Sequence, residues 1–97
     1  MSLLALLGLI AAAQGVDLQA RIKAAPMDVR MFIERRAECD HWLGEEPYDG
    51  DRAAQITEAI LELECARLPR DEAELRRRYR ARPDVLDLIS VTDGFLG

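Results

Sequence analysis

Four prolines, at positions 26, 47, 69 and 83, divide a sequence that is otherwise patterned for helices. Proline breaks a helix from within and pushes the residue before it out of the α region, so each one marks a turn or a helix start. Between the prolines, Ala, Leu, Glu and Arg dominate, and no alternating β-branched run favours a strand. The pattern predicts an all-α fold, a small bundle of three main helices with short flanking helices, forming a single domain over residues 16–97.

The first main helix is predicted over residues 26–39, with Pro26 in its first turn. A shorter helix, capped by Asp17, is predicted to precede it. One face of the main helix is apolar at the spacing of a buried stripe, through Val29, Phe32, Ile33 and Ala37.

The second main helix is predicted to begin at Asp49 or Asp51, as its cap, and to reach about Arg67. It carries two adjacent apolar stripes, Ile56, Ile60 and Leu63 on one and Leu61, Cys65 and Leu68 on the other. We therefore expect it to be the central helix, covered on both sides.

The third main helix is predicted over residues 72–81, after Leu68 and Pro69 have ended the second. Asp71 and Glu74 resemble a capping box at its start. Pro83 is expected to begin a short last helix.

The chain is small and acidic, with 97 residues and a formal net charge of -5. Phosphate binding needs a surplus of Lys and Arg that this chain lacks, so a nucleic-acid partner is not expected. One small core leaves no room for the two-layered clefts of most enzymes, which favours a binding or structural module.

Residues 1–15 are uncharged and mostly apolar, and they are predicted to be a signal-peptide h-region or an N-terminal apolar helix. The apolar run Leu3–Ala13 is too short for a helix to span ~30 Å of hydrocarbon, so no integral membrane segment is expected in the mature chain. Ala11 to Ala13 suit a cleavage site, although no Lys or Arg precedes the run. Export to the periplasm or secretion is the predicted localisation.

Export would place Cys39 and Cys65 in an oxidising compartment, where two cysteines of a small domain are normally joined in a disulfide. The alternative is a pair of buried free thiols.

Residues 39–51, CDHWLGEEPYDGD, gather the only His, the only Trp and five carboxylates, with no Lys or Arg. Gly44, Pro47 and Gly50 predict a loop between helices. Its candidate binding residues are His41, Trp42, Glu45, Glu46 and Tyr48, which would suit a basic or cationic partner if they face outward. The alternative is a structural loop whose aromatic side chains pack inward.

Metal binding is the second hypothesis for the function of this loop. Hard oxygen donors for calcium, with one imidazole, would come from His41, Asp40, Glu45, Glu46, Asp49 and Asp51, but the EF-hand spacing is absent. Zinc would use Cys39, His41 and Cys65 with a carboxylate, although C-x-H is not a usual ligand spacing. No cofactor is predicted.

Catalytic residues are not predicted. Ser2 and Ser90 lie outside any recognisable nucleophile motif, and Glu45 and Glu46 are neighbours rather than groups facing each other across a substrate. We expect a protein that is not an enzyme.

The string ERRAECDHWLGEEPYD, followed by a helix with a second Cys and then by LRRRYRARPDVL, resembles a group of small uncharacterised exported proteins of Gram-negative bacteria. These carry a C-x-H-W/F-x-G-E-E-P-Y-D segment and a downstream Cys. The resemblance spans about Pro26 to Leu88 and implies export and a disulfide, but no activity.

Together these features predict a small exported, non-catalytic helical module that binds another protein or an envelope component. The alternative function is a metal-binding protein that uses His41 and the acidic loop 40–51.

Overall fold

The computed structural model describes residues 17–94, which are helical apart from short connections. The elements are α2 (Met27–Leu43), α3 (Gly50–Glu62), the 3-10 turn η1 (Cys65–Arg67), α4 (Leu68–Arg78) and α5 (Pro83–Val91), and residues 17–24 form a helix before them. No strand occurs within residues 17–94, so the predicted all-α fold is confirmed. The predicted leader, residues 1–15, lies outside the described residues. None of the helices of residues 17–94 is long and apolar enough to cross a membrane.

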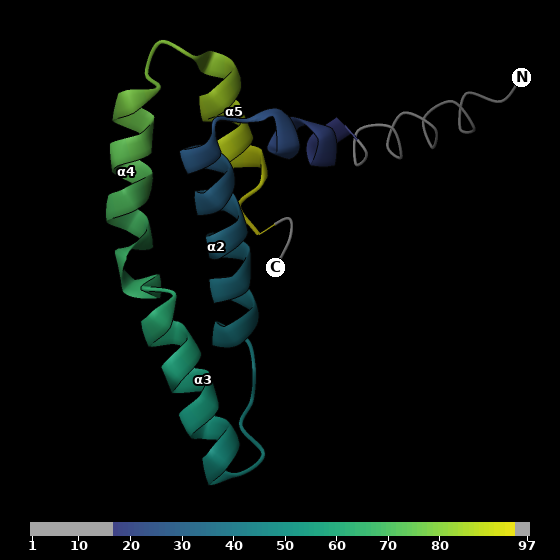
Figure 1. The fold of residues 1–97 in the computed structure, drawn as a ribbon, viewed down its shortest axis with the longest axis vertical. Helices are drawn as coiled ribbons and strands as arrows, with labels where there is room; N and C mark the ends of the chain where they lie inside the picture. Colours follow the sequence, from purple (N-terminus) through teal and green to yellow (C-terminus); the bar gives the residue numbers. More distant parts are fainter. Residues whose placement is uncertain (1–16, 95–97) are drawn as a thin grey trace, which may run out of the picture.

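The central helix of the fold is α2, which contacts α3, α4 and α5. Figure 1 shows α3 and α4 following one another along one side of α2, with their junction beside the C-terminal part of α2, where Cys39 lies. The buried core consists of Ile22, Val29, Phe32, Ile33, Leu75, Val85, Leu88 and Ile89. These residues come from the helix of residues 17–24, from α2, from α4 and from α5, so the core is built without α3.

The prediction that the helix after residue 49 is central is wrong. Among the thirteen residues of α3, Ile56 is the one that the described structure buries, while Leu61 is 71% exposed. α3 lies beside the last part of α2 and extends beyond its end (Figure 1), where no further helix of the described chain covers it. An apolar stripe indicates a face that can be buried, but only the tertiary arrangement supplies a neighbour.

α2 also ends later than predicted, at Leu43 rather than near Cys39. Residues 40–43 contain no Pro or Gly, so nothing in the local sequence stops the helix there. The backbone N–H of Gly44 closes the last turn by donating to the carbonyl of Asp40 at 3.1 Å. Asp40, His41 and Trp42 therefore lie on a helix, and the loop is confined to residues 44–49.

The start of α3 is predicted correctly, because the Asp49 carboxylate caps it by accepting the Arg52 backbone N–H at 2.7 Å. Its predicted end is wrong, since the helix stops at Glu62 and Glu64 takes up the left-handed conformation with φ of 53°. This backbone conformation is unfavourable for a residue with a side chain, and it breaks the helix ahead of η1.

α4 begins at Leu68, earlier than predicted, with Pro69 in its first turn. Pro69 thus starts a helix instead of ending one, as its fixed φ and missing N–H allow. The predicted capping box is wrong, because Asp71 lies inside α4 and pairs with Arg35 of α2 at 2.6 Å.

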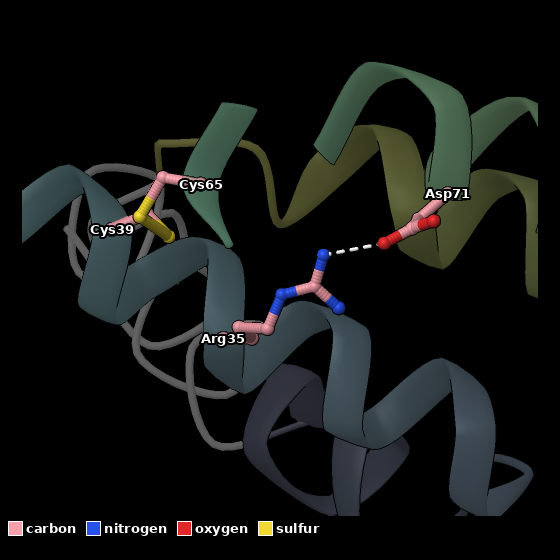
Figure 2. Close-up of a disulfide and its surroundings, with 4 residues drawn as sticks. All are labelled: Arg35, Cys39, Cys65 and Asp71. Atoms are coloured by element: carbon pink, nitrogen blue, oxygen red, sulfur yellow. Dashed lines mark hydrogen bonds and ion pairs between the residues drawn. A yellow bond between two sulfur atoms is a disulfide. The ribbon is translucent and has the colours of Figure 1, made fainter. Parts of the chain in front are cut away.

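A disulfide joins Cys39 of α2 to Cys65 of η1, with the two Cα atoms 5.7 Å apart. The predicted disulfide is confirmed, and the alternative of free thiols is excluded within the described residues. Figure 2 shows the bond one helical turn along α2 from the Arg35–Asp71 ion pair. The two links fasten the junction of α3 and α4 to α2.

Candidate functional site

The best candidate for a functional site lies where α2, the loop 44–49 and the start of α3 meet, at the end of the molecule farthest from α5 (Figure 1). Most of the predicted binding residues lie here. The structure divides them into side chains that hold the region together and side chains that face solvent.

The group that holds the region together centres on Arg52 of α3 and includes Trp42, Glu45 and the largely exposed His41. Its guanidinium donates to Glu45 Oε1 at 2.7 Å and lies 5.1 Å from the centroid of the Trp42 ring. His41 Nε2 lies 3.5 Å from the same Glu45 oxygen, one helical turn away along the chain, and its ring meets Trp42 edge to face. A cation over an indole and a guanidinium that donates to a carboxylate are both favourable contacts. These four side chains therefore fix the loop and the start of α3 against the end of α2.

The outward-facing group consists of Leu43, Glu46 and Tyr48, which we call the tip surface. Tyr48 is 81% exposed and Leu43 62% exposed, and Glu46 is exposed between them in sequence. Of the predicted binding residues, His41 is also largely exposed, whereas Trp42 and Glu45 are half-buried. Leu43 was missed from the sequence, because a leucine just before a glycine gives no sign of whether it packs inward.

The predicted metal ligands do not converge. Within the described residues no three His, Cys, Asp or Glu side chains come close enough to hold an ion. Both cysteines of the zinc reading are in the disulfide, Asp49 caps α3, and Glu45 is paired with Arg52.

Arg36 forms a second polar cluster, in the interior. It is 5% exposed, and its guanidinium donates to the Ile89 carbonyl at 2.7 Å, to Thr92 Oγ1 at 3.0 Å and to Glu72 Oε1 at 3.2 Å. The cation lies at the C-terminal end of α5, where helix carbonyls lack partners within the helix. Glu72 also accepts from Arg76 at 2.9 Å, so α2, α4 and α5 meet in one network.

Arg36 was not predicted from the sequence to be buried or functional. The available signal was its position on the apolar side of α2, three and four residues from the buried Ile33 and Phe32. The hydrogen bonds of the Arg36 guanidinium join α2 to α4 and α5, so this cluster has a structural role.

Asp28 forms a third cluster at the start of α2. Its carboxylate accepts hydrogen bonds from the Tyr79 hydroxyl, at 2.7 Å, and from the Arg78 guanidinium. Burial alone raises the pKa of Asp28, but the hydrogen bonds from Tyr79, Arg78 and the Val29 N–H outweigh it, so that the pKa lies below its usual value. The same hydrogen bond, followed by burial, raises the pKa of the Tyr79 hydroxyl. The cluster fastens α4 to the start of α2.

Comparison with known proteins finds no matching family, no similar curated protein and no similar solved structure. The function must therefore be argued from the residues of this chain.

Proposed function

We propose that the protein is a small exported, non-catalytic module that binds another protein or an envelope component through the tip surface. The observation that carries this proposal is the exposure of Tyr48 and Leu43, two large side chains with apolar surface. Both lie where the end of α2 and the loop 44–49 are held by the Arg52 contacts. Aromatic side chains are enriched at binding hot spots because they bury much area with few rotatable bonds.

The tip surface is held rigidly, which favours binding. The Asp49 cap, the Arg52–Glu45 ion pair and the contact of Arg52 with Trp42 lie directly behind it. A loop that is ordered before it binds loses less conformational entropy when the partner arrives.

The charge around the tip surface favours a basic partner. Residues 43–51 contain Glu45, Glu46, Asp49 and Asp51 and no Lys or Arg. Only Glu45 is paired with a basic side chain among the described residues. Electrostatic complementarity of this kind raises the association rate and selects partners of opposite charge.

The proposal of export rests on the apolar run of residues 3–13, on the buried disulfide and on the resemblance to exported proteins. Disulfides persist in oxidising compartments and are rare in the cytosol of mesophiles.

The proposal is tested with two variants of the disulfide-bonded protein as bait in periplasmic extract. The tip variant carries Glu46→Arg and Tyr48→Ala, and the control carries Glu38→Arg and Met31→Ala, which change an exposed acid and an exposed apolar residue on α2. Wild type and control are expected to retain the same partner, and the tip variant to lose it. The partner is then purified and titrated against all three proteins.

A loss of affinity of about tenfold or more in the tip variant alone, which corresponds to one aromatic contact of a hot spot, supports the proposal. Equal affinity of the tip variant and the wild type for every captured protein contradicts it.

A further inference from the structure

The outer face of α3 carries a row of exposed acids that have no basic partner. Asp51, Glu58 and Glu62 lie on the side of α3 opposite Ile56, and none of them forms an ion pair within residues 17–94. Ala54 and Leu61 lie along the same face at helical spacing, and the surface here is a shallow hollow lined by Ala53, Ala54, Thr57, Glu58, Leu61 and Glu62. Small residues along a helix face allow another helix to approach closely.

The outer face of α4 carries a matching row of arginines. Arg70 and Arg77 are exposed and lie two turns apart on the side of α4 opposite the buried Leu75. Ala73 and Glu74 are exposed between them, and the Glu74 carboxylate lies 3.9 Å from the Arg78 guanidinium, which offsets its charge. Arg80 follows directly and donates to the Arg77 carbonyl at 3.2 Å, which holds it beside the end of the helix. In the described part of the chain these three arginines pair with no carboxylate, in contrast to Arg76, Arg78 and Arg82.

Both rows lie on one edge of the molecule. α3 and α4 follow one another along the same side of α2 (Figure 1), and both pack on α2, so their outer faces point away from it. The unpaired charges of the edge are therefore acidic along α3 and basic along α4, with the bend at η1 between the two halves.

From this arrangement we infer that the edge is an interface with a second copy of the chain. A twofold axis near the bend at η1 places α3 of one copy across α4 of the other, and this contact occurs twice. Three acids then face three arginines in each half of the interface, and Leu61 is covered by the partner's helix. Such a contact is self-complementary and closed, which is the property of a twofold dimer interface. Side-by-side pairing of two α3 helices is disfavoured because it would bring acid against acid.

The dimer is expected to be reversible and sensitive to salt, because ion pairs at an exposed edge are individually weak and are screened by counterions. Sedimentation equilibrium of the disulfide-bonded chain over a range of protein and salt concentrations measures it directly. A dimer that dissociates as salt increases is the expected result.

Charge reversal identifies the surface. The variant Glu58→Arg with Glu62→Arg makes both rows mainly basic, and the variant Arg70→Glu with Arg77→Glu makes both rows mainly acidic. Each alone is expected to be monomeric under conditions in which the wild type is dimeric. A 1:1 mixture of the two is expected to form a heterodimer, because every contact in it again joins opposite charges. The control, Asp17→Arg with Glu38→Arg, changes the net charge of the chain equally but lies off the edge, and it is expected to dimerise like the wild type.

Three results would overturn the inference: a wild type that stays monomeric at every concentration, a dimer that both reversed variants still form, and two monomeric variants that do not pair when mixed. Circular dichroism melts of both variants show whether they remain folded, and the heterodimer test needs no activity and no knowledge of the tip partner. A failure here therefore leaves the proposed function of the tip surface untouched.

Discussion

Arg36 is the residue on which the contact between α2 and α5 most depends. Its guanidinium satisfies the Ile89 carbonyl and the Thr92 hydroxyl in a site that water does not reach. The Ile89 carbonyl would keep only a 3.4 Å hydrogen bond from the Thr92 hydroxyl if Arg36 were removed. A buried carbonyl that loses its main donor keeps most of the cost of its desolvation, so removing Arg36 is expected to destabilise the fold.

Replacing Arg36 with Met, which keeps the length of the side chain, is expected to lower the free energy of unfolding by about 2 to 4 kcal/mol. Urea denaturation monitored by circular dichroism measures this change. The matched control is Arg30→Met on the same helix, whose half-exposed ion pair with Glu34 predicts a change of no more than about 0.5 kcal/mol. Equal effects of the two substitutions would show that the Arg36 network does not hold α5.

The lowered pKa of Asp28 predicts how the free energy of unfolding depends on pH. A carboxylate whose pKa is lower in the folded than in the unfolded state contributes stability above the unfolded value, and this contribution disappears as the pH falls through the folded pKa. Asp28→Asn is therefore expected to be less stable than the wild type near neutral pH. The difference is expected to shrink below about pH 4, where the unfolded-state carboxylate of the wild type begins to protonate.

Urea midpoints of both proteins, measured from neutral pH into the acid range, check this prediction. Tyr79→Phe removes the main hydrogen bond to Asp28 and should reproduce part of the effect. A constant difference between wild type and Asp28→Asn at all pH values would contradict the assigned cause.

At the scale of elements, α3 packs on α2 but contributes no residue to the continuous core. Apart from Ile56, it is held by the Arg52 contacts at its start and by the disulfide just beyond its end. The remaining helices share a continuous core that does not include α3. Local unfolding is easiest in elements with few buried contacts, so α3 is expected to open before the others once its covalent link is lost.

Reduction of the disulfide is expected to lower the free energy of unfolding by about 3.5 kcal/mol, given a closed loop of roughly this length in the chain-entropy model. Amide hydrogen exchange should show the larger loss of protection in α3 and the smaller one in α2 and α5. The variant Cys39→Ser with Cys65→Ser should match the reduced protein, which separates the loss of the bond from any side effect of the reductant. An unchanged melt in dithiothreitol is the result that this account does not allow.

The elements also show what the sequence could and could not predict. Pro26, Asp49 and Pro83 marked helix starts correctly, because caps and prolines act through local backbone chemistry. The end of α2 was missed because residues 40–43 carry no stop signal. The pairing of Glu45 with Arg52 was not foreseen either, since it joins a loop to a helix and depends on how the loop folds. The burial predicted for α3 was wrong, because the apolar pattern of a helix does not show which other helices will cover it.

At the scale of the whole molecule, the described chain is long and thin, with dimensions of 56 × 35 × 17 Å. Such a shape leaves a large share of its surface exposed. The unpaired charges of the edge are sorted along it, with Asp51, Glu58 and Glu62 on α3 and Arg70, Arg77 and Arg80 on and after α4. The net charge of -5 does not reveal this separation, because the acids on α3 and the arginines on and after α4 cancel in the sum. The overall composition could not reveal this separation, because a count of charges says nothing about where they lie on the folded chain.

Export is a prediction about the whole chain. When the full sequence is expressed in a Gram-negative host, the product is expected in the periplasmic fraction, without free thiols, and with an N-terminus near residue 14 after cleavage at Ala13. Mass spectrometry of the intact and the alkylated protein measures both properties. A product that keeps residues 1–13 and two reactive thiols in the cytosol would refute the proposal of export.

Because Ile56 is the only buried residue of α3, the outer face of this helix is suited to substitution. A helix that is tethered by a disulfide and gives the interior little beyond Ile56 can accept new side chains on its outer face without disturbing the packing of the other helices. Surface positions away from the core usually change stability by less than about 0.5 kcal/mol when substituted. Randomising Ala54, Thr57, Glu58 and Leu61 together should therefore give a library in which most members still fold, so that α3 could serve as a display platform for selecting new specificities.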